Sequence, residues 1–425
     1  MGSLRRQGEP VTPHVLIVTG EYPPILGGVG DYTALLARHL QQLGVDIGVL
    51  TTRAGSEHRL EAKRRQSPSP GELGCSQDYQ RPTDTYLVEI SGSWGLSSWQ
   101  QVATAAKKIR PDIVHIQYQA AAFGMHPAVN LLPLYLRLRL GGVLVVTTFH
   151  DLRVPYIFPK AGPLRHAAVR ALDLFSHASV ATNRADLLKL GGTGVSASHR
   201  PKRWLIPLAT NIHCAPPPDF TRAAWRKKLG LGEDVLVLAY FGFMNDSKGV
   251  DLILNALDLL IKRGIDAELL VVGGETGTTD PTNRVYSRTI AGMIGSLHLD
   301  TKVHWTGFLP PPEVSAALLA SDICVLPFKD GASVRRGSLL AAIEHGLPTV
   351  TTFPESPEPL LIDGENIAFV ERNNPLAIAE SIERLWREPE HRLQLSAGAR
   401  LLASRFQWPD IARRHLEMYN YLLSP

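Results

Sequence analysis

A lysine stands close to a strand-ending glycine in the segment YFGFMNDSKGVDLILNAL, which covers residues 240–257. An apolar run ends at Gly242, a short polar loop follows, and Lys248 precedes apolar residues at helical spacing. The dipole of a helix favours anions rather than cations at its amino end. A bound phosphate would resolve this conflict, and a solvated surface lysine is the alternative. The pattern therefore predicts that Lys248 is an anion ligand.

A second cationic segment, LPFKDGASVRRGSLL, has the same form. We expect a strand to end at Phe328 and a helix to start near Val334, which would put Arg335 and Arg336 in its first turn. Free backbone N–H groups and two arginines together make an anion site. The alternative is a pair of surface arginines on a mobile loop.

The first apolar run of the chain, HVLIVTG, leads into GEYPPILGGVGDY. Gly27, Gly28 and Gly30 are expected directly before a helix, where glycines let backbone N–H groups approach an anion. The segment has neither the G-x-G-x-x-G spacing of dinucleotide folds nor the G-x-x-x-x-G-K of phosphate-binding loops. A tight strand–helix turn is the alternative.

His150 and Asp151 follow another apolar run, in VVTTFHDLRVPY. A histidine at a strand end can donate a hydrogen bond to a substrate or take part in proton transfer, and packing within the loop is the alternative. In PDIVHIQYQ, His115 alternates with apolar residues, which predicts a core histidine. The sequence contains no convincing Ser-His-Asp order, HExxH helix or CxxC pair.

Strands alternating with helices must position these residues, because the apolar runs and helical stretches follow one another twice along the chain. This order predicts an α/β fold with two tandem, doubly wound, Rossmann-like domains. The first covers 1–207 and the second 208–406, with a proline-rich linker near 207–220. A final helix covers 407–425, with Pro409 and Asp410 in its first turn. Residues 54–84 are expected to form a long loop.

Composition sets further bounds on the class of protein. The 425 residues are 44% hydrophobic and 20% charged, and no apolar run reaches the length of about 20 residues that spans a bilayer. The start, MGSLRRQGEP, lacks an apolar segment and does not read as a signal peptide. The three cysteines, Cys75, Cys214 and Cys324, have no metal or disulfide spacing. We therefore expect a cytoplasmic protein.

The net charge of +4 is unevenly distributed between the two halves. Residues 1–205 carry 23 Lys+Arg and 14 Asp+Glu, whereas residues 206–425 carry 21 and 26. The basic first half could hold an anionic ligand or contact the inner face of an anionic membrane as a peripheral protein. The alternative is that much of the excess belongs to the loop HRLEAKRRQ.

Taken in order, these segments resemble the family-four retaining glycosyltransferases of the GT-B architecture over nearly the whole chain. The matching elements are EYPPILGGVGDY, PDIVHIQY, TTFHD, FGFMNDSKGVDLILNAL, VVGG, HWTGFLPPPEVSAALLASDICVLPF, EHGLPTVTT and FQWPDIARRHLEMYNYL. The resemblance implies an interdomain cleft, a nucleotide-sugar donor held by the second domain, and a last helix that crosses back to the first domain. It implies no metal and no cofactor beyond the donor, and no nucleic-acid partner.

The resemblance also implies roles for single residues. Lys248 matches the donor-diphosphate lysine, His150 the histidine that faces the donor sugar, and the Gly27–Gly30 loop the one that closes on the diphosphate. Phe308 and Leu309 match the loop beside the nucleobase. The predicted catalytic residues are His150, Lys248 and Arg336. The predicted donor ligands are Gly27, Gly28, Gly242, Lys248, Gly274, Phe308, Leu309, Ser333, Val334, Arg335, Arg336 and Glu344, and the predicted acceptor ligands are Tyr22, Gln117 and Asp151.

The chain departs from the family where two glutamates are usual. Ser333 and Ala341 stand at those positions, and Phe243 replaces a usual arginine. Glu344, on a nearby helix face, is the one carboxylate that could take over contact with the ribose. Three functions stay open: a retaining transferase acting on a glycan, lipid or small-molecule acceptor, a sugar-nucleotide epimerase, and a catalytically silent homologue that acts as a binding partner.

Overall fold

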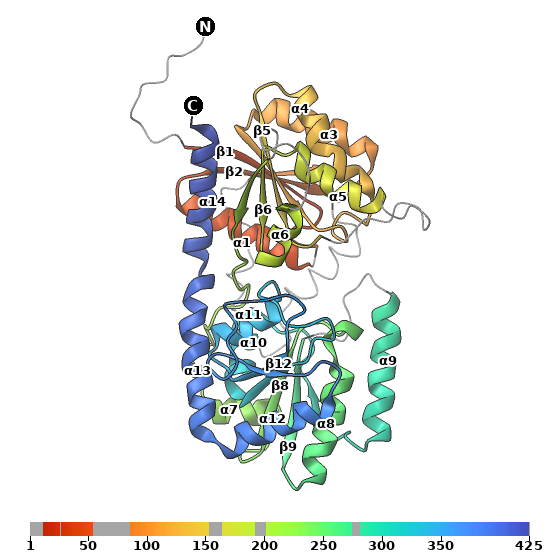
Figure 1. Ribbon diagram of the computed structural model, residues 1–425, viewed down its shortest axis with the longest axis vertical. Coiled ribbons are helices and arrows are strands. Elements are labelled where there is room, and N and C mark those ends of the chain that lie inside the picture. Colours follow the sequence, from red (N-terminus) through yellow and green to blue (C-terminus); the bar gives the residue numbers. More distant parts are fainter. Residues whose placement is uncertain are drawn as a thin grey trace. The chain divides into compact units, whose positions relative to one another are not determined.

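The chain folds into two compact units in the computed structural model, which describes residues 12–25, 27–53, 86–152, 164–191, 201–273 and 281–424. The first unit comprises Met1–Pro207 and Trp408–Pro425, and the second comprises Leu208–Gln407 (Figure 1). The C-terminal helix thus belongs to the same unit as the start of the chain. The predicted loop at 54–84 lies outside the described residues.

A parallel sheet forms the centre of the first unit, and in the described residues its strand order is β3-β2-β1-β4-β5-β6-β7. Its strands are β1 (His14–Thr19), β2 (Asp46–Thr52), β3 (Tyr86–Ile90), β4 (Ile113–Tyr118), β5 (Leu144–Phe149), β6 (Ala178–Ala181) and β7 (Lys202–Leu205). The helices are α1 (Gly28–Gln42), α3 (Leu96–Ile109), η1 (Pro127–Leu131), α4 (Leu132–Arg139), α5 (Leu164–Phe175), α6 (Arg184–Gly191) and α14 (Trp408–Leu423).

The second unit repeats this plan with the order β10-β9-β8-β11-β12-β13, again parallel. Its strands are β8 (Leu236–Phe241), β9 (Ala267–Val272), β10 (Val303–Trp305), β11 (Ile323–Leu326), β12 (Thr349–Thr352) and β13 (Ala368–Val370). The helices are α7 (Arg222–Lys228), η3 (Asp246–Lys248), α8 (Val250–Lys262), α9 (Pro281–Ser296), α10 (Pro311–Ala320), α11 (Gly337–Glu344), α12 (Pro375–Arg387), α13 (Pro389–Ala403) and η4 (Ser404–Phe406).

The strand order reverses once in each sheet, between β1 and β4 and between β8 and β11. The crossovers on either side of such a point run in opposite directions and leave a crevice at the carboxyl ends of the two strands, where ligands bind in this fold class. This directs attention to the segments that follow β1, β4, β8 and β11.

The predicted α/β class and tandem arrangement are confirmed, since the apolar runs form buried parallel strands. One strand was missed. Lys202–Leu205 forms β7 at the edge of the first sheet, where no strand was predicted before the linker near 207–220. The reason is composition: an edge strand is covered on one side only, so KRWL is half exposed and shows no continuous apolar run.

The predicted last helix is also confirmed as α14, with Asp410 in its first turn. Its buried residues recur at helical spacing and include Ile411, Met418 and Tyr419. Trp408, at its start, is fully buried, and its ring contacts Tyr32 and stacks on His39 of α1 at 5.6 Å between centroids. The apolar stripe of α14 therefore completes the core of the first unit.

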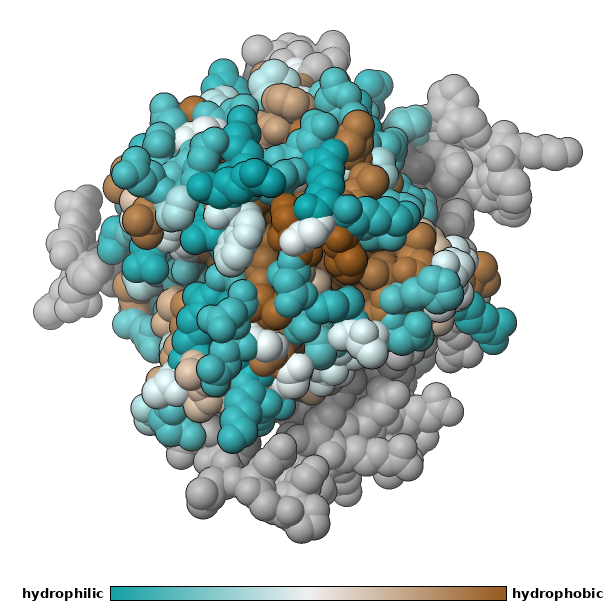
Figure 2. Space-filling view, turned by 90° about the horizontal axis from the view of Figure 1, so that it is seen from below, coloured by the Kyte–Doolittle hydropathy of each residue, from teal (hydrophilic) through white to brown (hydrophobic). Residues whose placement is uncertain are grey.

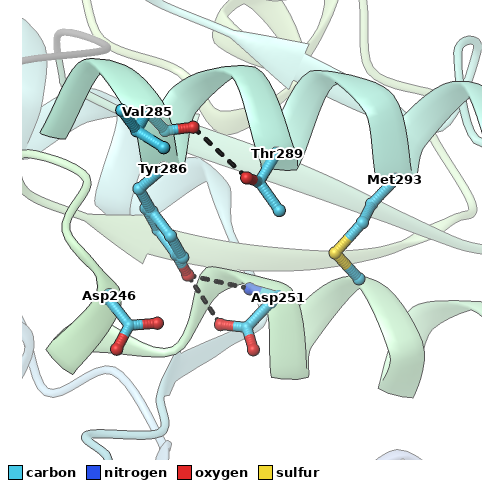
Figure 3. Close-up of a pocket in the computed structure, with 6 residues that line it drawn as sticks. All are labelled: Asp246, Asp251, Val285, Tyr286, Thr289 and Met293. Atoms are coloured by element: carbon cyan, nitrogen blue, oxygen red, sulfur yellow. Dashed lines mark hydrogen bonds between the residues drawn. The ribbon is translucent and has the colours of Figure 1, made fainter. Parts of the chain in front are cut away.

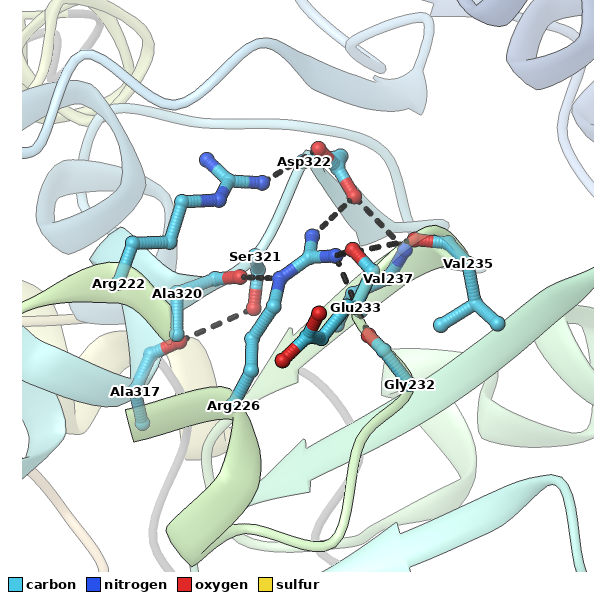
Figure 4. Close-up of polar contacts among 10 residues, drawn as sticks. All are labelled: Arg222, Arg226, Gly232, Glu233, Val235, Val237, Ala317, Ala320, Ser321 and Asp322. Carbon is cyan, nitrogen blue, oxygen red and sulfur yellow. Dashed lines mark hydrogen bonds and ion pairs between the residues drawn. The ribbon is translucent and has the colours of Figure 1, made fainter. Parts of the chain in front are cut away.

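A buried arginine fixes α7 to the amino ends of β8 and β11 (Figure 4). The Arg226 guanidinium donates to Asp322 at 2.7 Å and to the backbone carbonyls of Ala320, Gly232, Glu233 and Val235. The Asp322 carboxylate also accepts from the backbone N–H of Val237 at 2.8 Å and from Arg222 at 2.5 Å. One carboxylate thus accepts from three donors, two on α7 and one on β8.

Replacing Asp322 with asparagine is expected to lower the free energy of unfolding by about 1–3 kcal/mol, because the amide keeps one acceptor oxygen and leaves buried donors unpaired. Urea denaturation of the purified protein measures the change. Glu233→Gln is the matched control, since the Glu233 side chain is exposed and only its carbonyl joins the network. Equal stability of Asp322→Asn and the wild type would contradict this account.

Figure 2 shows the face that lies at the lower end of Figure 1. Hydrophilic side chains predominate there and surround a central group of hydrophobic ones. Within the described part of the chain, no helix combines the length and the apolar character needed to cross a membrane.

Candidate functional site

Lys248 lies close to Gly242, the glycine that follows the carboxyl end of β8. Gly242 follows β8 with φ of +126°, a conformation that side chains rarely adopt. A Cβ atom at this position would lie 2.7 Å from the Lys248 Nζ and 3.9 Å from the Ser338 Cβ. The glycine therefore makes room for the ammonium group at the carboxyl end of β8.

Lys248 is the last residue of η3, and α8 begins two residues later, at Val250. Among the described residues its ammonium group makes no hydrogen bond or ion pair. Burial, with a smaller contribution from the nearby Arg336 guanidinium, lowers the pKa of Lys248 to about 8. An anion bound beside two like charges favours the charged form of each, so an anion at this place would stabilise the Lys248 ammonium.

The two predicted arginines precede α11 instead of lying in its first turn, which corrects the expected helix start near Val334. The Arg336 N–H donates to the Ser333 carbonyl at 3.0 Å, so the chain closes a turn first and the helix begins at Gly337. Arg336 is the N-cap, and its side chain makes no capping hydrogen bond. Its guanidinium lies 4.6 Å above the Phe328 ring and pairs with Asp330, while its buried Nε has no partner among the described residues.

These features place three sources of positive potential at the point where the strand order of the second sheet reverses. They are the Lys248 ammonium, the Arg336 guanidinium and the amino end of α11, where Ser338 lies close to Gly242. The first N–H groups of a helix have no partner within it and favour anions. The arrangement suits a group with several negative oxygens, such as a diphosphate.

The other predicted donor ligands occupy different surroundings. Phe308, after β10, is 49% exposed, and Leu309 packs against the core. Val334 is buried and Ser333 bonds to Glu358. The Glu344 carboxylate accepts from Gln407 at 3.0 Å at the far end of α11, roughly 12 Å along the helix from Arg336 by the rise per residue, so the structure does not bring it to the cationic cluster. Gly274 lies outside the described residues.

Lys329, just after β11, forms a hydrogen bond and ion pairs with the segment that carries Lys248. Its backbone N–H donates to the Ser247 carbonyl at 2.9 Å, and its Nζ lies 2.6 Å from Asp246 and 3.0 Å from Asp251. The Tyr286 hydroxyl also donates to Asp251, at 2.6 Å. Lys329 thus braces η3 and the start of α8.

A cavity of about 480 Å³ lies beside this brace (Figure 3). Its lining residues come from η3, α8 and α9, and they are Asp246, Asp251, Val285, Tyr286, Thr289 and Met293. Two carboxylates and several apolar side chains face it, so it is unsuited to a phosphate. The cluster around Lys248 is therefore better suited to an anion than this cavity is.

In the first unit, His150 lies at the end of β5 and is held by a buried chain of polar groups. Its Nε2 donates to the Gln117 carbonyl oxygen at 2.9 Å, and the Gln117 amide lies 3.4 Å from His115. His115 in turn contacts the Thr148 hydroxyl at 2.8 Å and the Tyr419 hydroxyl at 2.6 Å. The chain runs from α14 through β4 to His150.

This network corrects one predicted role and confirms another. Gln117 was predicted to bind an acceptor, but it is fully buried and orients His150 instead. His115 is a core residue, as predicted. Burial, together with the nearby His415, lowers the pKa of His150 to about 3, so the imidazole is neutral at pH 7. The Tyr32 ring packs edge-on against it at 5.0 Å between centroids.

Two carboxyl groups beside the glycine loop were missed by sequence reasoning. Glu21 follows β1, and Asp31 lies in the first turn of α1, which begins at Gly28, so Gly28 and Gly30 are inside the helix and not before it. Burial raises the pKa of both carboxyls to about 7, and Asp31 adds to the shift of Glu21. The available signal was an acidic residue directly after a strand.

The Glu21 carboxylate packs against Gly27, where a Cβ would overlap it at 1.8 Å, and its buried Oε2 has no partner among the described residues. Tyr22 and Asp151, the other predicted acceptor ligands, are buried at 2% and 9% exposure. In the described part of the chain, no group of three or more His, Cys, Asp or Glu side chains is placed to hold a metal ion.

Comparison with known proteins gives two family matches. The family described as Glycosyl transferases group 1 matches residues 221–402, and Glycosyltransferase Family 4 matches residues 26–188. Together they cover most of both units.

Two curated relatives and one solved structure illustrate the likeness. A D-inositol 3-phosphate glycosyltransferase from Xylanimonas cellulosilytica is 28% identical over 57% of this chain and 57% of its own length. The chain spans about half the length of the first curated relatives it matches. A GDP-mannose-dependent alpha-(1-6)-phosphatidylinositol monomannoside mannosyltransferase from Mycolicibacterium smegmatis is 24% identical over 95% of this chain and 97% of its own. Anabaena Alr3699/HepE in complex with UDP-glucose superposes with a TM-score of 0.71, 15% identity and coverage of 96% of this chain and 100% of that one.

Proposed function

Because this chain belongs to glycosyltransferase family four and has the GT-B fold, we propose that it transfers a sugar from a nucleoside-diphosphate sugar to an acceptor hydroxyl, with retention of the anomeric configuration. The observation that carries the proposal is the cluster of Lys248, Arg336 and the amino end of α11, in which one carboxylate, Asp330, pairs with Arg336 and Lys248 has no ion pair among the described residues. A donor diphosphate supplies the missing negative charge.

The proposed mechanism needs no protein nucleophile. The acceptor oxygen forms a bond to the anomeric carbon on the face from which the diphosphate departs, and the leaving diphosphate oxygen takes the acceptor's proton. Lys248, Arg336 and the helix end stabilise the charge that develops on the diphosphate. We assign no metal or other cofactor to this step.

His150 is proposed to contact the donor sugar as a neutral imidazole. A neutral ring beside a carbon that becomes positive avoids the repulsion that an imidazolium would cause. The Gln117 contact keeps a proton on Nε2 and fixes the orientation of the ring.

Relatives suggest classes of donor and acceptor for trial. The UDP-glucose complex and the GDP-mannose-dependent relative point to UDP and GDP sugars, and inositol 3-phosphate and phosphatidylinositol monomannoside are acceptors to test first. We place the acceptor near Tyr22 and Asp151, with Glu21 and Asp31 beside it. Contact with an anionic membrane stays a prediction from the charge asymmetry.

The direct test combines a thermal-shift screen with product analysis. A nucleotide at about 100 times its dissociation constant should add about 2.7 kcal/mol of stability. NMR of the first product should then show a new glycoside with the donor's anomeric configuration. An isomerised sugar nucleotide would indicate an epimerase, and nucleotide binding without any product would indicate a silent homologue.

Replacing Lys329 with methionine is expected to weaken nucleoside-diphosphate binding by about threefold to tenfold, the size of one ordinary hydrogen bond. The reason is that two carboxylates of the η3–α8 segment lose their common cation and Lys248 is no longer braced. Calorimetric titration measures the change. Lys262→Met, which removes an exposed ion pair with Asp258 at the other end of α8, is the control. Unchanged affinity in Lys329→Met would contradict the bracing role.

A further inference from the structure

The Glu358 carboxylate contacts the loop that carries Ser333 and Arg336, and no pattern in the sequence indicated this contact. The Ser333 hydroxyl donates to the Glu358 Oε1 at 2.6 Å. Glu358 belongs to the loop that follows β12, 25 residues farther along the chain. This loop lies next to the one that carries Arg336, because β11 and β12 are neighbours in the sheet.

The backbone fixes the two loops against each other. A Cβ atom on Gly331 would lie 2.7 Å from the Glu355 nitrogen and 2.8 Å from the Phe353 oxygen. The Ala332 N–H donates to the Thr352 carbonyl, and the Thr352 hydroxyl donates to the Phe328 carbonyl at 2.6 Å. The position of Glu358 beside Ser333 is therefore set by packed backbone.

Ser333 lies close to the cationic cluster in the chain. Its backbone carbonyl accepts a hydrogen bond from the backbone N–H of Arg336 at 3.0 Å. A carboxylate at this place cannot serve a diphosphate, which it repels. It can accept hydrogen bonds from hydroxyl groups, because the two oxygens of a carboxylate together offer about four acceptor sites. A sugar is the hydroxyl-rich part of a nucleotide sugar.

A nucleotide sugar contains a ribose and a transferred sugar, and the strand order indicates that the transferred sugar is the one near Glu358. The exposed Phe308 follows β10 at one edge of the sheet, the cations lie where β8 and β11 diverge, and Glu358 follows β12 on the other side. A donor with its base near Phe308 and its diphosphate at Lys248 extends its transferred sugar toward β12. The ribose would lie on the opposite side of the diphosphate.

We propose that the Glu358 carboxylate, held by Ser333, accepts hydrogen bonds from hydroxyl groups of the transferred sugar. This inference rests on the proposed donor site and adds a residue that determines donor-sugar specificity. It also supplies a carboxylate at the place where the family resemblance implies a glutamate and this chain has Ser333.

The test compares each bare nucleotide with its sugar, using UDP against UDP-glucose and GDP against GDP-mannose in calorimetric titrations. In the pair that the wild type binds, Glu358→Gln should weaken the sugar nucleotide by about tenfold and leave the bare nucleotide within about twofold. Glu355→Gln, on the same loop and exposed, is the matched control and should change neither. Introducing Ser333→Glu into a Glu358→Ala background should recover part of the lost affinity.

The outcomes separate this inference from the function it rests on. If the wild type binds neither nucleotide nor sugar nucleotide, the proposed donor site fails and the inference with it. If the nucleotides bind but Glu358→Gln weakens the bare nucleotide and its sugar equally, or weakens neither, the donor site stands and the role of Glu358 is overturned. A selective loss with recovery by Ser333→Glu supports it, because a merely structural tether would not discriminate between the two ligands.

Discussion

Replacing His150 with alanine is expected to lower kcat by about 100-fold or more, while the affinity for a bare nucleoside diphosphate stays within about twofold. Positioned groups that act on the reacting centre contribute roughly 10²–10⁴-fold to rates. His150 belongs to the first unit, whereas the cations proposed to hold the nucleotide belong to the second. Initial rates and calorimetric titration on the same preparation measure both quantities, and a loss in kcat without a loss in nucleotide binding identifies a role in the chemical step.

A variant in the polar chain of Gln117, His115 and Tyr419 should cause a smaller loss of kcat than His150→Ala, and it serves as a control. Tyr419→Phe removes one hydroxyl at the far end of the chain, where it contacts His115 at 2.6 Å. We expect a smaller loss of kcat, of about threefold to tenfold, since the ring of His150 keeps its contact with Gln117. Full activity in His150→Ala, or a product with inverted configuration, would overturn the proposed role of His150.

Removing the charges of both Lys248 and Arg336 is expected to weaken nucleoside-diphosphate binding by about 100-fold or more. A hydrogen bond to a charged group contributes roughly 1.5–3 kcal/mol, which corresponds to about 10-fold to 100-fold for each of Lys248→Met and Arg336→Met. The two substitutions are expected to be non-additive, because the side chains act on one anion and on each other. Wild-type affinity in either single variant would remove that residue from the site.

The pH dependence of binding gives an independent check on Lys248. Its pKa of about 8 in the free protein must rise when an anion binds, because the negative charge favours the ammonium form. Binding therefore takes up a proton, and the affinity for a sugar nucleotide should fall as pH rises through about 8, by up to about tenfold per unit. Lys248→Arg should keep the affinity and flatten the profile, since guanidinium stays charged over this range. A flat wild-type profile would contradict the assignment.

The sequence by itself determined the architecture and the ends of the strands. Apolar runs such as HVLIVTG and VLVLAYFG are local signals of strands buried on both faces, and alternation with helices forces those strands to be parallel. The carboxyl ends of parallel strands share one edge, so Gly242, Lys248 and His150 could be placed at ligand-binding edges from their positions alone. This information is local, because it depends on residue type and spacing within about 20 positions.

The tertiary structure decided which distant side chains meet. Ser333 and Glu358 are 25 residues apart, and His115 and Tyr419 are 304 apart; no periodicity in the sequence relates either pair. Their contacts depend on strand order, on the packing of loops across neighbouring strands and on the return of α14 to the first unit. The same holds for the start of α11, which a turn at Ser333 shifts to Gly337. It holds also for Gln117, which meets His150 because β4 and β5 are neighbours in the sheet. Residue types thus fixed where chemistry could occur, whereas packing between segments fixed which groups carry it.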